Sequence, residues 1–364
     1  MTSDRRIHLF DINSFLWYIK GRIVFETKLY RIFYFYSEDC IALSEQDLIR
    51  WIAAILLGDY FKDVIAMKIG FIGAGKVGFS LGRYFKENGL DVTGYFSRSP
   101  KSAREAADFT AAKAYGSISE ILSDSDTLFI TVPDGAIADV WAEMKDLDVK
   151  NKNICHCSGS ISSAAFFDGE NRGACVYSVH PLYAVNDRYN SWQDLKKAYF
   201  AVEGSARHLE CIKSLLEAAG NTVISMDTQM KPLYHAAAVM ASNLSTALFQ
   251  VSADMLVQCG FDEDQAHAAL LPLFEGNAKN IARCGVADSL TGPVERNDVQ
   301  TVQRHLAAFA KINSREWETL YRILSLRLTA VAEQKCSRDS GKNCDYAKMK
   351  GILTKHEQEH CSYI

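Results

Sequence analysis

Residues 73–78 have the glycine spacing of turns that bind phosphate. They read GAGKVG, which fits G-x-G-x-x-G, and they follow the apolar strand KIGFIG (68–73) and open a helical stretch. In such a turn the first glycine allows a tight bend, the second lets the backbone approach a pyrophosphate, and the third permits close helix–strand packing. The helix start supplies N–H groups to the anion. The sequence therefore predicts a dinucleotide site at Gly73, Ala74, Gly75, Lys76, Val77 and Gly78, the alternative being a tight turn without a ligand.

The end of the second strand, DVTGYFSR (91–98), indicates which dinucleotide is bound. NAD-binding proteins usually carry Asp or Glu about 20 residues after the turn, to hold the ribose 2′-hydroxyl. This chain instead has Ser97, Arg98 and Ser99. An arginine fork flanked by hydroxyl groups suits a 2′-phosphate. The sequence favours NADP(H) over NAD(H), unless Arg98 is only a solvated loop residue.

The strand DTLFITVP (126–133) ends where open sheets bind ligands, past the crossover between strands. Val132 and Pro133 are therefore expected to line the cofactor channel near the nicotinamide-side ribose. Strand termination is their alternative role, and both roles are compatible.

Hydride transfer requires a proton donor or acceptor and groups that polarise the substrate. Ser158 lies in HCSGS (156–160), after a predicted strand, and His180 lies in SVHPLY (178–183), where we expect it in a loop fixed by Pro181. A histidine there can donate to a substrate oxygen near neutral pH, although a structural histidine bonded to the backbone is the alternative.

Two further candidates lie at the start of a long helical stretch. Lys231 precedes Pro232, which places it at the beginning of the helix, and His235 follows four residues later on the same face. We expect Lys231 and His235 to polarise or orient a substrate, the alternative being an exposed N-terminal lysine.

Strands and helices alternate from residue 67 to residue 226, a pattern typical of an α/β fold with a mostly parallel sheet covered on both faces. From residue 227 to about 335 the sequence predicts only helices, over 231–259, 262–283, 298–312 and 314–333. We predict four segments: an N-terminal extension (1–66), a nucleotide-binding domain (67–226), a helical domain (227–335) and a polar, partly disordered tail (336–364).

Composition narrows the function classes. The chain has 364 residues and a net charge of −4, which gives no basic footprint for nucleic acid or a membrane surface. Ten cysteines without a disulfide-framework spacing indicate a reducing cytoplasm, and the tail cysteines and histidines fit no common zinc site. Residues 1–66 carry no part of the fingerprint. We expect Met67 to be the natural start, the alternative being an amphipathic surface helix in front of it.

Taken together, GFIGAGKVG, HCSGS, HPLY, YHAAAVMASN and TGPVERND resemble the Rossmann-like family with a DUF2520-type C-terminal domain. That family belongs to the 6-phosphogluconate dehydrogenase-like superfamily, and the resemblance covers about residues 67–330. It implies a doubly wound Rossmann sheet followed by an all-helical C-terminal domain, and an NADP-dependent oxidoreductase.

The helical region is similar to those of ketopantoate reductase and pyrroline-5-carboxylate reductase. In the hydroxyacid and ketopantoate enzymes a lysine and an asparagine four residues later act together; Lys231 matches the lysine, but His235 stands in the asparagine position. Ser158 and His180 match the substrate-contacting serine and histidine of prephenate dehydrogenase.

We therefore expect a cytoplasmic NADP(H)-dependent enzyme that acts on a small carbonyl, imine or hydroxyl compound in the cleft between the domains, with no metal. The long apolar helical faces and the resemblance together indicate a homodimer. The competing hypothesis is a sensor that binds NADP(H) without turnover.

Overall fold

The computed structural model describes residues 67–340 and 345–354, and the chain divides into two compact units, Met1–Thr228 and Gln229–Ile364. The sheet unit ends two residues beyond the predicted domain boundary. The predictions for residues 1–66, and with them the proposed start at Met67, lie outside the described residues.

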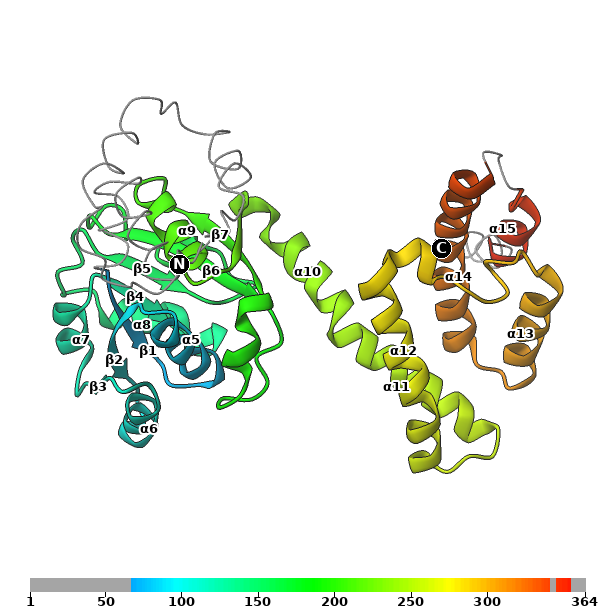
Figure 1. Cartoon of the computed structure of the whole chain (residues 1–364), viewed down its shortest axis with the longest axis horizontal. Helices are drawn as coiled ribbons and strands as arrows, with labels where there is room; N and C mark the ends of the chain where they lie inside the picture. Colours follow the sequence, from blue (N-terminus) through cyan, green and yellow to red (C-terminus); the bar gives the residue numbers. More distant parts are fainter. Residues whose placement is uncertain (1–66, 341–344, 355–364) are drawn as a thin grey trace, which may run out of the picture. The chain divides into compact units, whose positions relative to one another are not determined.

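The sheet unit contains one eight-stranded sheet in the order β3-β2-β1-β4-β5-β6-β7-β8 (Figure 1). All neighbouring strands pair in parallel except β6 and β7, which are antiparallel. The predicted Rossmann-type, mostly parallel sheet is confirmed. The strands are β1 (Lys68–Ile72), β2 (Asp91–Phe96), β3 (Lys113–Ala114), β4 (Thr127–Ile130), β5 (Asn153–His156), β6 (Cys175–Leu182), β7 (Tyr199–Gly204) and β8 (Thr222–Ser225).

Helices cover both faces of the sheet. The first face packs on α5 (Lys76–Glu87), α6 (Pro100–Thr110) and α9 (Leu209–Ala218), and the second packs on α7 (Ile118–Asp124) and α8 (Ile137–Glu143). Short 3-10 turns follow β4 (η1, Asp134–Ala136), β5 (η2, Ser163–Ala165) and the loop after β6 (η3, Ser191–Lys197). Of these helices, α7 and α9 were not predicted from the sequence.

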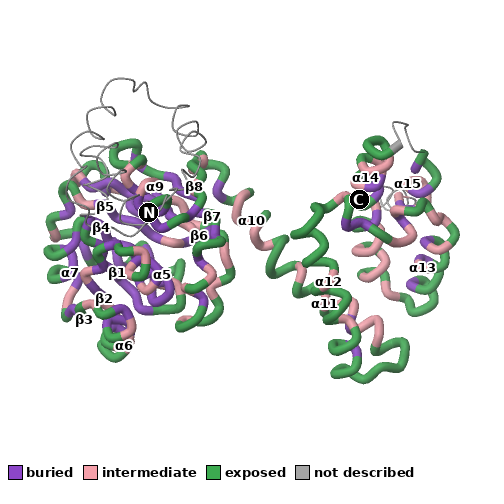
Figure 2. The backbone as a smooth tube through the Cα atoms, viewed as in Figure 1, coloured by how far each residue is buried: buried purple, intermediate pink, exposed green. Residues whose placement is uncertain are grey.

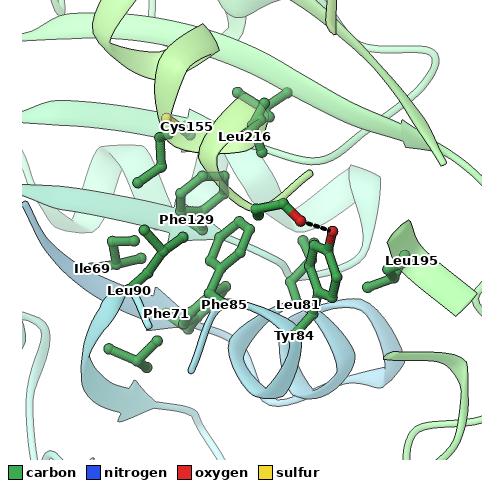
Figure 3. Close-up of a cluster of buried hydrophobic side chains, with 14 of the residues drawn as sticks. Ile69, Phe71, Leu81, Tyr84, Phe85, Leu90, Phe129, Cys155, Leu195 and Leu216 are labelled. Carbon is green, nitrogen blue, oxygen red and sulfur yellow. Dashed lines mark hydrogen bonds between the residues drawn. The ribbon is translucent and has the colours of Figure 1, made fainter. Parts of the chain in front are cut away.

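The first face holds an aromatic core in which Phe71 of β1 stacks on Phe129 of β4 at 5.6 Å between ring centroids (Figure 3). Tyr84 of α5 joins this core and donates its hydroxyl to the Ala219 carbonyl over 2.6 Å. Burial raises the pKa of Tyr84 to about 12. The hydroxyl therefore stays protonated as a donor and ties α5 to the end of α9.

The second unit is helical. Its helices are α10 (Lys231–Ala241), α11 (Asn243–Gln258), α12 (Glu263–Ser289), α13 (Val299–Lys311), α14 (Arg315–Ser340) and α15 (Ala347–Thr354), after the turn η4 (Thr228–Met230). The single predicted helix over 231–259 is wrong in one respect: Ser242, with ψ −77°, separates α10 from α11. Asp262 caps α12 in a capping box with Gln265.

The tail also differs from the prediction. Helix α14 continues to Ser340, and α15 places Met349 and Leu353 in the buried core of the helical unit. The prediction of a polar, partly disordered tail from residue 336 is therefore wrong for these residues. Apolar residues spaced four apart allow α15 to pack on α13 and α14. No helix among the described residues has the length and apolar character needed to cross a membrane.

Candidate functional site

The glycine turn has the geometry that its sequence predicted. Gly73 has φ +108°, and a Cβ there would lie 2.9 Å from the Thr131 carbonyl carbon. A Cβ on Gly78 would lie 2.3 Å from Thr131 Oγ1 and 2.5 Å from the Gly73 carbonyl oxygen. On Gly75 it would meet nothing closer than the Thr131 oxygen at 3.8 Å. Two glycines are thus required by packing, whereas Gly75 leaves open space above the turn.

Helix α5 begins at this turn without a side-chain cap. Gly75 is its N-cap residue, no side chain bonds the first N–H groups, and the first turn contains no acidic residue. Unpaired N–H groups and the helix dipole favour an anion at this point. Lys76, the first helical residue, is exposed beside them, whereas Val77 is half-buried and packs against the core.

A cavity of about 270 Å³ lies beside the turn. It brings together several predicted cofactor residues: Gly73, Ala74, Gly75, Ser97, Arg98, Val132 and Pro133. Lys76, Val77, Gly78 and Ser99 do not line it. Its other lining residues, which sequence reasoning missed, include Ser102, Ile118, Ala136, Asp139, Val140 and Glu143. The residues from α8 carry no motif, so only the tertiary structure places them there.

Arg98 and Ser99 differ in their availability for a ligand. Arg98 is exposed and makes no hydrogen bond or ion pair with any described residue. Ser99 caps α6 by accepting from the Ser102 N–H over 3.3 Å. Arg98 is therefore an unpaired guanidinium on the cavity wall, and Ser99 positions the helix next to it.

Arg188, which the sequence did not single out, supports the turn from the loop after β6. Its Nη2 donates to the Ala74 carbonyl at 3.4 Å, its Nη1 forms an ion pair with Glu105 of α6 at 3.1 Å, and its guanidinium lies 4.3 Å from the centre of the Phe79 ring. The neighbouring Asp187 is held by hydrogen bonds from Asn190 and from the backbone N–H groups of residues 189 and 190, which lower its pKa, with a smaller effect from the Lys76 charge. Arg188 lies more than 80 residues from Ala74, Phe79 and Glu105, so no local sequence pattern reveals these contacts.

Ser158 lies at the carboxyl end of the sheet as predicted, but its hydroxyl is fully used. It donates to Asp134 Oδ2 at 2.7 Å and accepts from the N–H groups of Ser160 and Ile161 at 3.1 and 2.9 Å. A serine hydroxyl has one donor and two acceptor positions. In the structure the Ser158 hydroxyl fixes the turn after β5, and its expected role as a hydrogen-bond partner of the substrate stays a prediction.

Asp134 is the centre of this cluster and was missed, although it directly follows Pro133. The same carboxylate oxygen also accepts from Ser160 Oγ at 2.8 Å. These bonds connect the segment after β4 to the segment after β5 at the sheet edge where ligands bind.

His180 lies in a strand, not in a loop. Strand β6 continues to Leu182, and His180 pairs with Ala201 of the antiparallel strand β7. The expected loop position is wrong because antiparallel pairing with β7 extends β6 through Pro181. His180 remains half-buried near the carboxyl end of β6.

A buried acid on β7, also missed, shares the sheet face of His180. Glu203 is opposite Ser178, which places it diagonally across from His180. It is 2% exposed and accepts hydrogen bonds of 2.8 Å from the Ser163 N–H, the Ser163 hydroxyl and the Thr228 hydroxyl. A polar group of Ser178, His180 and Glu203 therefore lies on this face.

In the helical unit, Lys231 is the first residue of α10, as predicted, and is 1% exposed. His235 lies one turn later, and its Nδ1 is buried without a hydrogen-bond partner among the described residues. This burial contradicts the alternative of an exposed terminal lysine. Lysine is almost never buried to this extent without a specific partner.

Family models match both units of the chain. The model described as NADP oxidoreductase coenzyme F420-dependent matches residues 68–155, and the domain of unknown function DUF2520 matches residues 198–328. Protein TM1727 from Thermotoga maritima is 30% identical, with a TM-score of 0.61, over 73% of this chain and 99% of that one. The chain belongs to the NADP oxidoreductases with a DUF2520 domain.

Other solved structures share the fold of this family. The candidate NADP oxidoreductase BF3122 from Bacteroides fragilis is 22% identical, with a TM-score of 0.56, over 73% of this chain and 99% of that one. A reductive aminase from Aspergillus terreus, solved with NADPH, is 16% identical, with a TM-score of 0.51, over 79% of this chain and 99% of that one. No curated protein matches the chain.

This NADP oxidoreductase has residues that fit its cofactor. Gly75, the N-cap residue of the uncapped helix α5, and the unpaired Arg98 guanidinium line one cavity. Together they offer N–H donors for a pyrophosphate and a cation for a 2′-phosphate. Among the described residues, no group of three or more His, Cys, Asp or Glu side chains could hold a metal ion.

Proposed function

We propose that this oxidoreductase transfers a hydride between NADP(H) and a small carbonyl, imine or hydroxyl compound. NADP(H) supplies or accepts the hydride when it is bound. The residues that would hold it are the glycine turn, Ser97, Arg98, Val132 and Pro133. The observation that carries this proposal is the cavity that joins the glycine turn to an unpaired arginine.

The chain's own contribution to the chemistry is proton transfer and polarisation of the substrate. We assign the proton to His180, which lies near the carboxyl end of β6 in the polar group with Ser178 and Glu203. The imidazole is suited to this role because its ordinary pKa lies close to neutral pH. Ser158 and Asp134 hold the neighbouring turn and need not touch the substrate.

Lys231 and His235 are proposed to polarise or orient the substrate. A lysine ammonium attracts a developing negative charge most strongly where water is excluded, and Lys231 is buried. The unpartnered Nδ1 of His235 is a hydrogen-bonding group without a protein partner in the part of the chain described. The proposed location of the enzyme remains the cytoplasm.

The proposal is tested by screening pools of small carbonyl, imine and hydroxyl compounds for NADPH oxidation or NADP reduction, with thermal shift to rank the ligands. We expect at least one pool to be turned over by the full chain, and the same pool to be inactive with His180→Asn. Ligands that stabilise the protein but are never turned over would favour the sensor.

Arg98→Ala tests the choice between the two dinucleotides. Loss of a charge-assisted hydrogen bond is expected to weaken NADPH binding by about 1–3 kcal/mol and to leave NADH binding nearly unchanged. Fluorescence titration with both cofactors measures this difference. Lys101→Ala is the matched control, because Lys101 is the next cation along the chain but does not line the cavity. Equal losses for both cofactors would remove Arg98 from the 2′-phosphate site.

We also propose a homodimer built mainly on residues 231–333. Much of the backbone tube over α10–α12 is coloured as exposed or intermediate (Figure 2). The exposed residues of these helices include the large apolar residues Leu233, Met240, Leu244, Leu271 and Leu273. Exposed apolar patches of this kind usually mark interfaces. We expect sedimentation at micromolar concentration to give a dimer and the double variant Leu233→Glu with Met240→Glu to give a monomer. A monomeric native chain would contradict this proposal.

A further inference from the structure

Two carboxylates form one wall of the cofactor cavity and have no role in the proposals above. Asp139 and Glu143 both line the cavity from α8. They are four residues apart, so they lie on one face of that helix, where like charges repel each other. Neither makes a hydrogen bond or an ion pair with any described residue. The cavity thus carries two carboxylates that no ion pair neutralises, beside the single positive charge of Arg98.

The other walls determine which part of the dinucleotide this charge faces. Arg98 stands on the wall proposed for the 2′-phosphate, and the ribose that carries this phosphate also carries the base. If the cofactor is placed as proposed, the base must therefore occupy the same cavity. Ile118 and Val140 supply apolar walls there, and such walls suit the faces of a purine ring.

An ionised carboxylate only accepts hydrogen bonds. The phosphates of a dinucleotide repel it, so it can bond only to hydrogen-bond donors of the base or of the ribose hydroxyls. The 6-amino group is the exocyclic donor of adenine, whereas a 6-oxo purine presents an acceptor at the same position.

We propose that Asp139 and Glu143 select adenine by accepting a hydrogen bond from its 6-amino group. Arg98 at one side of the cavity and the acids at another would then fix the orientation of the adenosine half: the phosphate binds at the cation and the amine at the carboxylates. This inference rests on the proposed placement of NADP(H), and it concerns recognition of the base and not the reaction.

The test compares NADPH with its analogue in which hypoxanthine replaces adenine, by calorimetric titration of the full chain without substrate. The native protein should bind NADPH about tenfold or more tightly than the analogue, the effect of one hydrogen bond to a charged group. The double variant Asp139→Asn with Glu143→Gln should lose this preference, because an amide can donate as well as accept. Each single variant shows which acid carries the contact. Asp146→Asn, just after α8 and outside the cavity lining, is the matched control and should keep the preference.

The outcomes separate this inference from the placement of the cofactor. Equal affinity of the native protein for both dinucleotides, or a preference that survives in the double variant, would overturn adenine selection while Arg98→Ala still discriminated NADPH from NADH. If the double variant bound NADPH and its hypoxanthine analogue more weakly by the same factor, the acids would be assigned to a ribose hydroxyl. That result would also overturn adenine selection. Binding that is insensitive to both Arg98→Ala and the acid variants would overturn the placement itself.

Discussion

His180→Asn is expected to lower kcat by about 10²–10⁴-fold, the usual scale of general acid–base catalysis, while leaving the affinity for NADPH and the melting temperature unchanged. Asparagine keeps a polar, uncharged side chain in β6 but cannot exchange a proton near neutral pH. The measurement requires a substrate from the screen, followed by steady-state kinetics and a cofactor titration on the same preparation.

His208→Asn is the matched control for this prediction. His208 precedes α9, has φ +61° and bonds Asn153 Oδ1 over 3.1 Å. Asparagine tolerates this left-handed backbone, and His208 lies outside the proposed site, so the substitution should leave kcat and NADPH affinity nearly unchanged. A loss of activity in His180→Asn that is matched by lower NADPH affinity or lower stability would assign His180 a structural role.

Lys231→Met is expected to differ in kind from His180→Asn. A polarising cation acts on both the bound substrate and the transition state, so its loss should raise KM and also lower kcat. Lys231→Arg, which keeps the charge but changes its shape, should recover part of kcat. An unchanged KM would show that Lys231 does not contribute to binding of the substrate in the ground state. Its role would then be stabilisation of the transition state or packing.

Local sequence patterns predicted the architecture because each βα unit carries its own signal. The buried strand before Gly73, the open turn and the amphipathic helix after it occupy about 20 residues, and each rule they follow is local. The doubly wound sheet then follows from the repeated alternation of such units.

The parts of the site that were missed depend on contacts between distant segments. Arg188 reaches the Ala74 carbonyl across 114 residues of sequence, and Glu203 accepts from Ser163 across 40. His180 was assigned to a loop because a proline follows it, and only the pairing with β7 shows that the strand continues. The occupied hydroxyl of Ser158 is likewise invisible in the sequence, since its donor position is taken by Asp134, 24 residues earlier.

The pair Gly75→Ala and Gly78→Ala is expected to separate the two functions of the glycine turn. At Gly75 the new methyl group has room in the protein, with its nearest neighbour 3.8 Å away, so stability should fall only by the roughly 1 kcal/mol that alanine costs at an N-cap. The methyl group would occupy the space through which a pyrophosphate approaches the backbone. Affinity for NADPH and NADH should therefore fall together by about 10- to 100-fold, as hydrogen bonds to a charged group are lost.

At Gly78 the same methyl group meets the protein itself. It would lie 2.3 Å from Thr131 Oγ1 and 2.5 Å from the Gly73 carbonyl oxygen, which are hydrogen-bonded to each other over 2.8 Å. Helix α5 must then move away from β1 and β4, and overpacking of this kind typically costs about 1–3 kcal/mol of unfolding free energy. Gly78→Ala should thus lose stability and cofactor binding together, measured by urea unfolding and by titration. If Gly75→Ala bound NADPH normally, the open space over the turn would not be where the pyrophosphate binds, because the new methyl group fills that space.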